Sequence, residues 1–118
     1  ITRENAIFSL PIEPHHGGMK KAGRFLQMSG ATGPDGLALD EAGNLVVVQA
    51  GAGTAWVFSR IGEPLYRIRS TAGIRTTNVA YGGEDRRTLY ITESEQGAIL
   101  RVRLPHPGRV MYSHCGSN

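Results

Sequence analysis

An aspartate in a short glycine-rich motif is the first residue that could do chemistry. Gly33-Pro34-Asp35-Gly36 stands directly before the apolar segment Leu37-Ala38-Leu39. A carboxylate in this place could hold a hard cation or act as a general base. Pro-Asp-Gly is also a favourable turn sequence, and a plain turn is the alternative interpretation.

A second polar position occurs in a related context. Asn78 precedes Val79-Ala80-Tyr81, and its amide could bind a substrate or simply open a strand. Gln49 and Glu93 stand at matched strand ends. We expect these two side chains to be solvated or to bond within hairpins rather than to be catalytic.

The histidines and the cysteine are weaker candidates. His15-His16 lies in a segment rich in proline and glycine with no third ligand nearby, which favours a solvated loop over a metal site. His114-Cys115 lies in a polar tail and has no third group to complete a nucleophile and base pair. Because Cys115 is the only cysteine, an intramolecular disulfide and a cysteine-rich zinc site are excluded.

Length and composition predict one globular unit. The chain has 118 residues, of which 40% are hydrophobic, 19% are charged and 16 are glycine, so turns must be frequent. No apolar run approaches the roughly 20 residues of a membrane-spanning helix, so we expect no membrane segment. The net charge is +3, but arginines such as Arg67 and Arg69 flank apolar Ile68, as on the solvated face of a strand. Without a series of stacking aromatics beside them, we expect no nucleic-acid partner.

The elements that must position Asp35 and Asn78 have the periodicity of strands. Short runs rich in β-branched and aromatic residues are separated by turn-forming residues, and no window carries a helical apolar stripe. The expected strands cover 6–10, 24–28, 37–39, 45–49, 54–58, 64–69, 78–81, 88–92 and 98–104. The sequence therefore predicts an all-β protein.

An internal repeat indicates the architecture. Leu37 and Val79 are 42 residues apart, and Leu45 and Leu89 are 44 apart. Propeller blades, which are four-stranded antiparallel sheets, repeat at about 40 to 50 residues. The opening residues 1–8 resemble 91–100, so we expect the chain to begin inside a blade and to hold about two and a half blades. Residues 1–112 would form this partial β-propeller and 113–118 a polar tail.

The predicted propeller cannot close by itself. Propellers close with roughly four to eight blades, so we expect missing blades or further copies of the chain to complete the ring, and we favour a fragment of a longer protein. In a propeller, the starts of the inner strands surround one mouth of the central channel. We therefore expect Asp35, and a residue near Asn78, to face that channel.

Three segments resemble one known family. These are Gly33-Pro34-Asp35-Gly36-Leu37-Ala38-Leu39-Asp40-Glu41-Ala42-Gly43-Asn44-Leu45-Val46-Val47, then Thr76-Thr77-Asn78-Val79-Ala80-Tyr81-Gly82-Gly83, then Thr88-Leu89-Tyr90-Ile91-Thr92-Glu93-Ser94. They are similar to the last third of a member of the SMP-30/gluconolactonase/LRE family. The resemblance implies a six-bladed propeller that hydrolyses sugar lactones or other small lactones with one divalent metal ion, calcium or zinc, in its channel.

The resemblance also implies roles for single residues. Asp35 matches the metal-binding aspartate of the family, which is also proposed to be the base that activates water. The family's other metal ligands, a glutamate and an asparagine, have no matching positions here, nor do the arginine and asparagine that grip substrate. We therefore expect this chain to be the C-terminal portion of a metal-dependent lactone hydrolase and to be inactive alone. A non-catalytic binding propeller and a truncated product without activity are the alternatives.

Localisation has little support in the sequence. The chain opens at Ile1 without methionine and without a basic and then apolar leader. A signal peptide is thus absent, removed or outside the sequence given. We expect a cytoplasmic protein.

Overall fold

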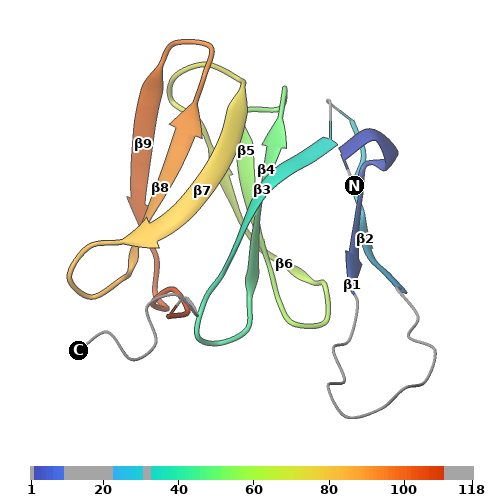
Figure 1. Ribbon diagram of the computed structural model, residues 1–118, viewed down its shortest axis with the longest axis horizontal. Coiled ribbons are helices and arrows are strands. Elements are labelled where there is room, and N and C mark those ends of the chain that lie inside the picture. The colour runs from blue at the N-terminus through green and yellow to red at the C-terminus, as the bar shows by residue number, and fades with distance from the viewer. Residues whose placement is uncertain (1, 10–22, 31–32, 111–118) are drawn as a thin grey trace.

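Nine antiparallel strands form three sheets in the computed structural model, which describes residues 2–9, 23–30 and 33–110 (Figure 1). The first sheet pairs β1 (Ala6–Ser9) with β2 (Gly23–Gln27). The second has the order β3 (Gly33–Leu39), β4 (Leu45–Ala50), β5 (Thr54–Phe58) and β6 (Pro64–Arg69). The third has the order β7 (Thr76–Gly82), β8 (Thr88–Glu93) and β9 (Ala98–Arg103). Within the described ranges the only helical segment is the 3-10 turn η1 (Thr2–Glu4), which confirms the all-β prediction.

The strands follow the side-chain pattern that predicted them. In β4, Val46, Val47 and Val48 are all buried, because this central strand has neighbouring strands at both edges and packed layers on both faces. In β9, the odd and even positions alternate, and Arg101 and Arg103 lie on the exposed face. The arginines therefore form solvated strand faces, as the alternation indicated.

One backbone feature confirms the repeat. Asn5, Gly53 and Gly97 each come directly before a strand, namely β1, β5 and β9, and have φ values of 56°, 57° and 68°. Glycine adopts this left-handed conformation freely, and asparagine is among the few other residues that tolerate it. The first sheet therefore holds the counterparts of the third and fourth strands of the second sheet, and the described chain begins inside a blade.

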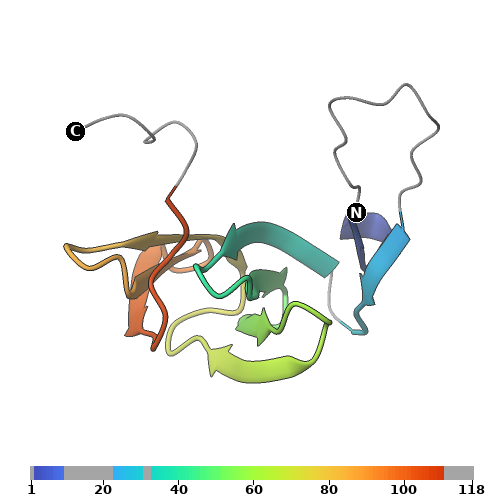
Figure 2. The same cartoon turned by 90° about the horizontal axis from the view of Figure 1, so that it is seen from below.

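Two apolar clusters hold the three sheets together. The cluster between the second and third sheets contains Val46, Val48, Ala55, Val57, Val79, Leu89, Ile91 and Leu104. The cluster between the first and second sheets contains Ile7, Met28, Val47 and Phe58, with Trp56 stacked on Phe58 at 6.1 Å between ring centroids. The second sheet thus forms a central layer with one neighbour on each side (Figure 2), as a propeller blade does.

A strap follows β9 and returns to the second sheet. Its residues, 104–109, donate backbone hydrogen bonds from Leu104 to the carbonyl of Arg87, from Gly108 to Arg86 and from Arg109 to Leu39. Gly108 also forms an isolated β-bridge with Asp40. The strap therefore ties the β3–β4 turn to the third sheet, an arrangement that the sequence did not predict.

Several expectations lie outside the described residues. These are the roles of His15-His16 and His114-Cys115 and the tail at 113–118; the domain boundary at 112 stays a prediction. Among the helices that the structure describes, none is long and apolar enough to cross a membrane.

Candidate functional site

Asp35 lies in a β-bulge near the start of β3. The strand pairs with β4 up to Pro34 and again from Leu37, so Asp35 and Gly36 interrupt the regular register. The interpretation of Pro-Asp-Gly as a plain turn is therefore wrong, because these residues belong to a strand. A bulge adds one residue to a strand and re-aims its side chain, and bulges are common beside active sites.

The third sheet repeats this feature one blade later. The register of β7 against β8 shifts between Thr76 and Asn78. The offset of 42 residues that relates Leu37 to Val79 makes Thr77 the counterpart of Asp35, and Asn78 that of Gly36. The equivalent of Asp35 is thus Thr77, the neighbour of Asn78, a position that the sequence analysis did not single out.

β3 and β7 lie side by side, which brings Gly36 against Asn78 (Figure 1). A Cβ atom at position 36 would stand 2.7 Å from the Cα atom of Asn78. Only glycine fits this approach without moving one of the two strands. The structure thus places Asn78 beside the bulge that carries Asp35, although no contact is described between the Asp35 and Asn78 side chains.

The amide of Asn78 is oriented by its own strand. Its Oδ1 accepts a hydrogen bond from the backbone N–H of Val79 at 2.9 Å. The Thr92 hydroxyl accepts the N–H of Asn78 at 3.1 Å and pairs with the Thr77 hydroxyl at 3.0 Å. With Oδ1 engaged, the NH₂ group of this exposed side chain is the part that can donate to a ligand.

Asp35 is exposed and lines a hollow of about 260 Å³ together with Thr2, Ile7, Phe8, Pro34 and Leu37. The Thr2 hydroxyl donates to the carbonyl of Pro34 at 2.7 Å and so fixes the backbone beside the carboxylate. No hydrogen bond among the described residues engages the Asp35 carboxylate. Its oxygens are therefore available to a cation or to water.

The donor set is incomplete for a metal ion. Across the part of the chain that the structure describes, no three His, Cys, Asp or Glu side chains gather closely enough to hold one. Calcium takes six to eight oxygen ligands and zinc usually four ligands. Asp35 fits as one ligand of such a site, and the described residues do not form the rest.

Glu93 is buried, with 1% of its surface exposed, so of the two expected alternatives, solvation or bonding within a hairpin, solvation does not apply. Its carboxylate accepts the N–H groups of Glu95 at 2.6 Å and Gln96 at 2.9 Å, which confirms a hairpin role. Burial raises the pKa of Glu93, but N–H donors from Gln96, Glu95, Gly73 and Arg75 outweigh it, so the pKa lies below the usual range.

Gln49 is also buried rather than solvated, at 4% exposure. Its Nε2 donates to the carbonyl of Ser29 at 2.8 Å, and its Oε1 accepts the indole N–H of Trp56 at 3.2 Å. Gln49 thus binds the segment that leads into β3, and Glu93 binds the segment that leads into β7. These matched residues hold the two bulged strands in place, which is a structural rather than a catalytic role.

Comparison with known proteins decides the family. The model described as the SMP-30/Gluconolactonase/LRE-like region matches residues 2–95. The chain belongs to the SMP-30/gluconolactonase/LRE-like family. Asp35, Thr77 and Asn78 all lie within the matched region. No curated protein matches the sequence significantly.

Several solved structures share the fold. A luciferin-regenerating enzyme superposes with a TM-score of 0.77 at 19% identity over 91% of this chain. A calcium-binding protein, regucalcin, from Agrobacterium tumefaciens gives 0.76 at 22% identity over 92%. A candidate gluconolactonase gives 0.72 at 22% identity over 91%. The chain spans 41%, 41% and 34% of these three proteins, so its fold is a portion of theirs.

Proposed function

We propose that this chain is the C-terminal portion of a metal-dependent hydrolase that opens a sugar lactone or another small lactone with water. The observation that carries the proposal is Asp35, an exposed carboxylate in a bulge that faces a hollow. Family membership supports it, and so do the names of two structures with this fold, a calcium-binding regucalcin and a candidate gluconolactonase.

Asp35 would serve the reaction in two ways. One carboxylate oxygen would bind a divalent cation, calcium or zinc, and the other would accept the proton of the attacking water. When bound, such a cation polarises a carbonyl oxygen and lowers the pKa of nearby water. Asp35 is exposed and has no hydrogen-bond partner among the described residues, so it can take either role without breaking a structural contact.

Asn78 would contact the substrate. Because Oδ1 is held by the N–H of Val79, the NH₂ group remains to donate to a ring or hydroxyl oxygen of a lactone. Gly36 keeps this side chain close to the bulge of Asp35. Asp35 and Asn78 would thus offer one carboxylate and one hydrogen-bond donor on neighbouring strands.

The remaining ligands would come from further propeller blades, supplied by a longer chain or by further copies. With one carboxylate available, residues 1–118 alone would bind a divalent ion weakly and would not hydrolyse lactones. Isothermal titration of the purified chain with calcium and with zinc, beside a lactone hydrolysis assay, tests this. Tight binding of one ion with turnover would contradict the incomplete site.

Substitution in the longer natural protein tests the catalytic role. Asp35→Asn should lower lactone hydrolysis at least about 100-fold, the usual scale for a lost general base, and should weaken binding of the divalent ion. Asp85→Asn is the matched control, since Asp85 is an exposed carboxylate that pairs with Arg103 on the third sheet. Unchanged activity of Asp35→Asn would reject the role. A natural protein with neither activity nor bound metal would favour the non-catalytic binding propeller.

A further inference from the structure

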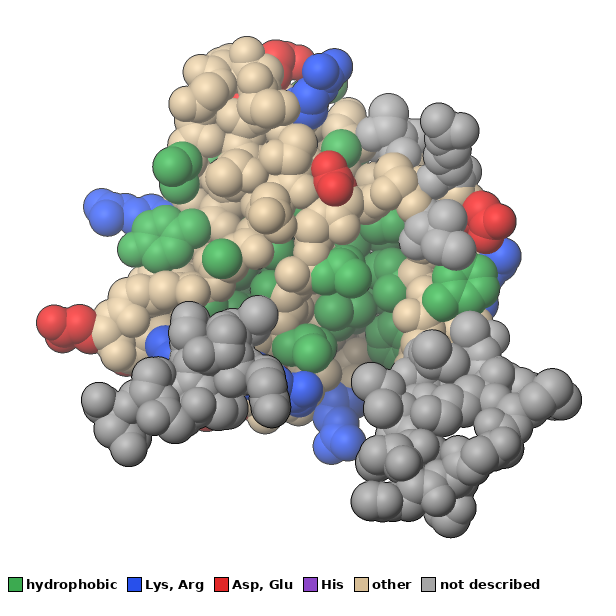
Figure 3. Space-filling view, in the orientation of Figure 1, with side chains coloured by type: hydrophobic (Ala, Val, Ile, Leu, Met, Phe, Trp, Pro, Cys, Tyr) green, Lys and Arg blue, Asp and Glu red, His purple; other side chains and the backbone are tan. Residues whose placement is uncertain are grey.

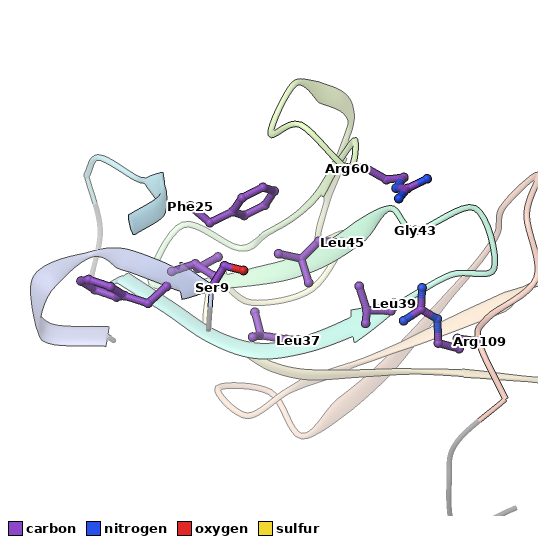
Figure 4. A pocket seen from close by; sticks show the side chains of 10 residues that line it. Ser9, Phe25, Leu37, Leu39, Gly43, Leu45, Arg60 and Arg109 are labelled. Atoms are coloured by element: carbon purple, nitrogen blue, oxygen red, sulfur yellow. The ribbon is translucent and has the colours of Figure 1, made fainter. Parts of the chain in front are cut away.

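The hollows that border the first sheet differ in what surrounds them. The largest of them, of about 460 Å³, lies beside β3, and hydrophobic side chains gather on this face of the molecule (Figure 3). Phe25, Leu37 and Arg60 are among the residues that line it (Figure 4). A propeller blade has four strands and the described first sheet has two, so the packing of a blade accounts for this hollow. We assign it no ligand.

Another hollow, of about 240 Å³, lies between β2 and the part of the second sheet formed by β4, β5 and the start of β6. We call it the seam hollow and define it by Leu26, Met28, Ser29, Trp56, Phe58 and Pro64. None of the described residues of β1 or β3 lines it, so it does not depend on the open edge of β1. It also contains neither Asp35 nor Asn78, and it is therefore separate from the candidate site described above.

One wall of the seam hollow is aromatic. Trp56 and Phe58, on alternate positions of β5, stack with their ring centroids 6.1 Å apart and their planes at 22°. Trp56 is only partly buried, although its indole N–H already donates to Gln49. Leu26 and Met28 form the facing wall on the first sheet. Since an apolar cavity of roughly 150 Å³ is enough to bind benzene, the seam hollow has room for a benzene ring with a short side arm.

The two ends of the seam hollow differ in polarity. At one end the β5–β6 turn packs against β2, because a Cβ atom on Gly62 would lie 3.3 Å from the Cδ2 atom of Leu26. Pro64 lines this end and pairs with the last residue of β5, whereas Gln49 pairs with the first. Gln49 binds the carbonyl of Ser29, whose hydroxyl has no hydrogen bond among the described residues. An apolar hollow with a few polar groups at one end is typical of sites for small molecules.

The charge beside the aromatic wall is positive. Arg67 of β6 pairs with Trp56 across the strands, and its guanidinium carbon lies over the indole ring, 5.4 Å from the centroid. This exposed guanidinium has no ion pair with any described carboxylate. Among the described residues, no Asp or Glu lines the seam hollow. Because a guanidinium binds a carboxylate through two parallel N–H donors, a ligand whose ring contacts Trp56 could place a carboxylate on Arg67.

We propose that the seam hollow binds a small aromatic carboxylate, with its ring against Trp56 and its carboxylate on Arg67. The ring removes partly exposed apolar surface of both walls from water, which favours binding. The arm between ring and carboxylate is two or three carbon atoms long, as the separation of Arg67 from the indole requires. Because the walls belong to two different sheets, the bound ligand joins them and stabilises the attachment of the first sheet to the second.

3-Phenylpropionate is the probe, and Trp56 is the reporter because it is the only tryptophan of the chain. In a titration of the 118-residue chain, we expect a saturable change of tryptophan fluorescence with a dissociation constant of about 1 mM or lower. 3-Phenylpropanol, which keeps the ring and lacks the charge, should bind at least about fivefold more weakly. Butyrate, which lacks the ring, should cause no saturable change. Amides of β2 should exchange more slowly when the probe is bound.

Substitutions test the role of Arg67. Arg67→Gln should weaken binding of 3-phenylpropionate at least about fivefold and leave binding of 3-phenylpropanol nearly unchanged, and Arg67→Lys should retain part of the affinity. Arg69→Gln is the matched control, since Arg69 is two positions along the same strand and pairs with Thr54 instead of Trp56.

Four results would overturn the proposal. The first is the absence of a saturable fluorescence change with 3-phenylpropionate. The second and third are equal affinities for the acid and the alcohol, and equal losses in Arg67→Gln and Arg69→Gln, because binding would then not depend on a carboxylate at Arg67. The fourth is unchanged exchange of β2 amides at saturation, which would place the probe outside the seam hollow.

Discussion

Tyr81 is the residue whose environment most clearly sets a pH limit. Its hydroxyl is buried with no hydrogen-bond partner among the described residues, and Gly108 of the strap lies directly against its side chain. Burial, and then the negative charge of Asp40, raise the pKa of Tyr81 from 10.0 to about 12. The folded protein therefore resists ionisation of this phenol.

This shift gives an alkaline prediction with a definite sign. Below pH 10 the phenol is neutral in both states, so its contribution to stability is complete. Between pH 10 and about 12 the unfolded chain loses its proton first, so the free energy of unfolding should fall. Urea unfolding at pH 8, 10 and 11 measures this. Tyr81→Phe should remove the part of this decrease that the phenol causes. Near pH 8 it should hardly change the free energy of unfolding, because it deletes an unpaired buried hydroxyl. An equal fall in both proteins would contradict the assignment.

Glu93 predicts the opposite dependence at acid pH. Its lowered pKa means that the unfolded chain takes up a proton before the folded one does, starting near pH 4.5, the ordinary value for glutamate. Stability should therefore be complete above that pH and should be lost as the pH falls through the lower pKa of the folded state.

Glu93→Gln tests this dependence. It should lower the thermal midpoint at pH 7, since an amide replaces a carboxylate that accepts several backbone N–H groups, and it should flatten the acid loss. Thermal melts from pH 7 to pH 3 measure both effects. Glu95→Gln is the control, because Glu95 is an exposed side chain in the same turn. If the two variants behave alike, the buried carboxylate does not hold this turn.

At the scale of elements, the contact between β3 and β7 depends on Gly36. A methyl group there would press on the backbone of Asn78, which cannot swing away as a side chain end can. Gly36→Ala should therefore destabilise the protein by about 1–3 kcal/mol, the usual cost of overpacking. Gly23→Ala in β2 is the matched control, since nothing lies within 4 Å of its added methyl group. Chemical unfolding of both variants measures the difference. Equal stabilities would mean that β3 and β7 separate easily.

The strands and their order were predictable because each depends on local pattern. The alternation of polar and apolar residues predicted the exposed arginines of β6 and β9. The internal repeat predicted that the first sheet is part of a blade, and its two strands are the outer half of one. The bulge at Asp35 was not predictable, because Pro-Asp-Gly favours a turn locally and only pairing with β4 makes it a strand. The motif predicts Asp35 as a site residue, whereas its counterpart Thr77 becomes apparent only from the register of β7 against β8.

Longer-range contacts explain the remaining differences. Gln49 and Glu93 look like ordinary polar strand ends, and their burial arises from connections that cross over them from the preceding sheet. The strap at 104–109 has no regular pattern, and its position depends on backbone contacts with β3 and on Tyr81. Such contacts join residues far apart in the chain. No local window of sequence contains both partners.

At the scale of the whole molecule, the three sheets are held unequally. The second and third share the larger apolar cluster, the strap and the ion pair between Arg86 and Glu41. The first sheet has two strands and is attached mainly through Ile7 and Met28, which pack on Val47 and Phe58. A two-stranded hairpin is marginally stable by itself, so the first sheet depends on this attachment.

This inequality predicts stepwise opening. In native-state hydrogen exchange of the 118-residue chain, amides of β1 and β2 should exchange through a local opening well before those of β4, β5 and β8. Ile7→Ala should speed exchange in the first sheet and leave the other two nearly unchanged. Leu89→Ala, in the fully buried cluster between the second and third sheets, should instead lower protection in both of them by about 2–5 kcal/mol. Uniform protection across all three sheets would contradict this order, because it would require the first sheet to open only with the rest.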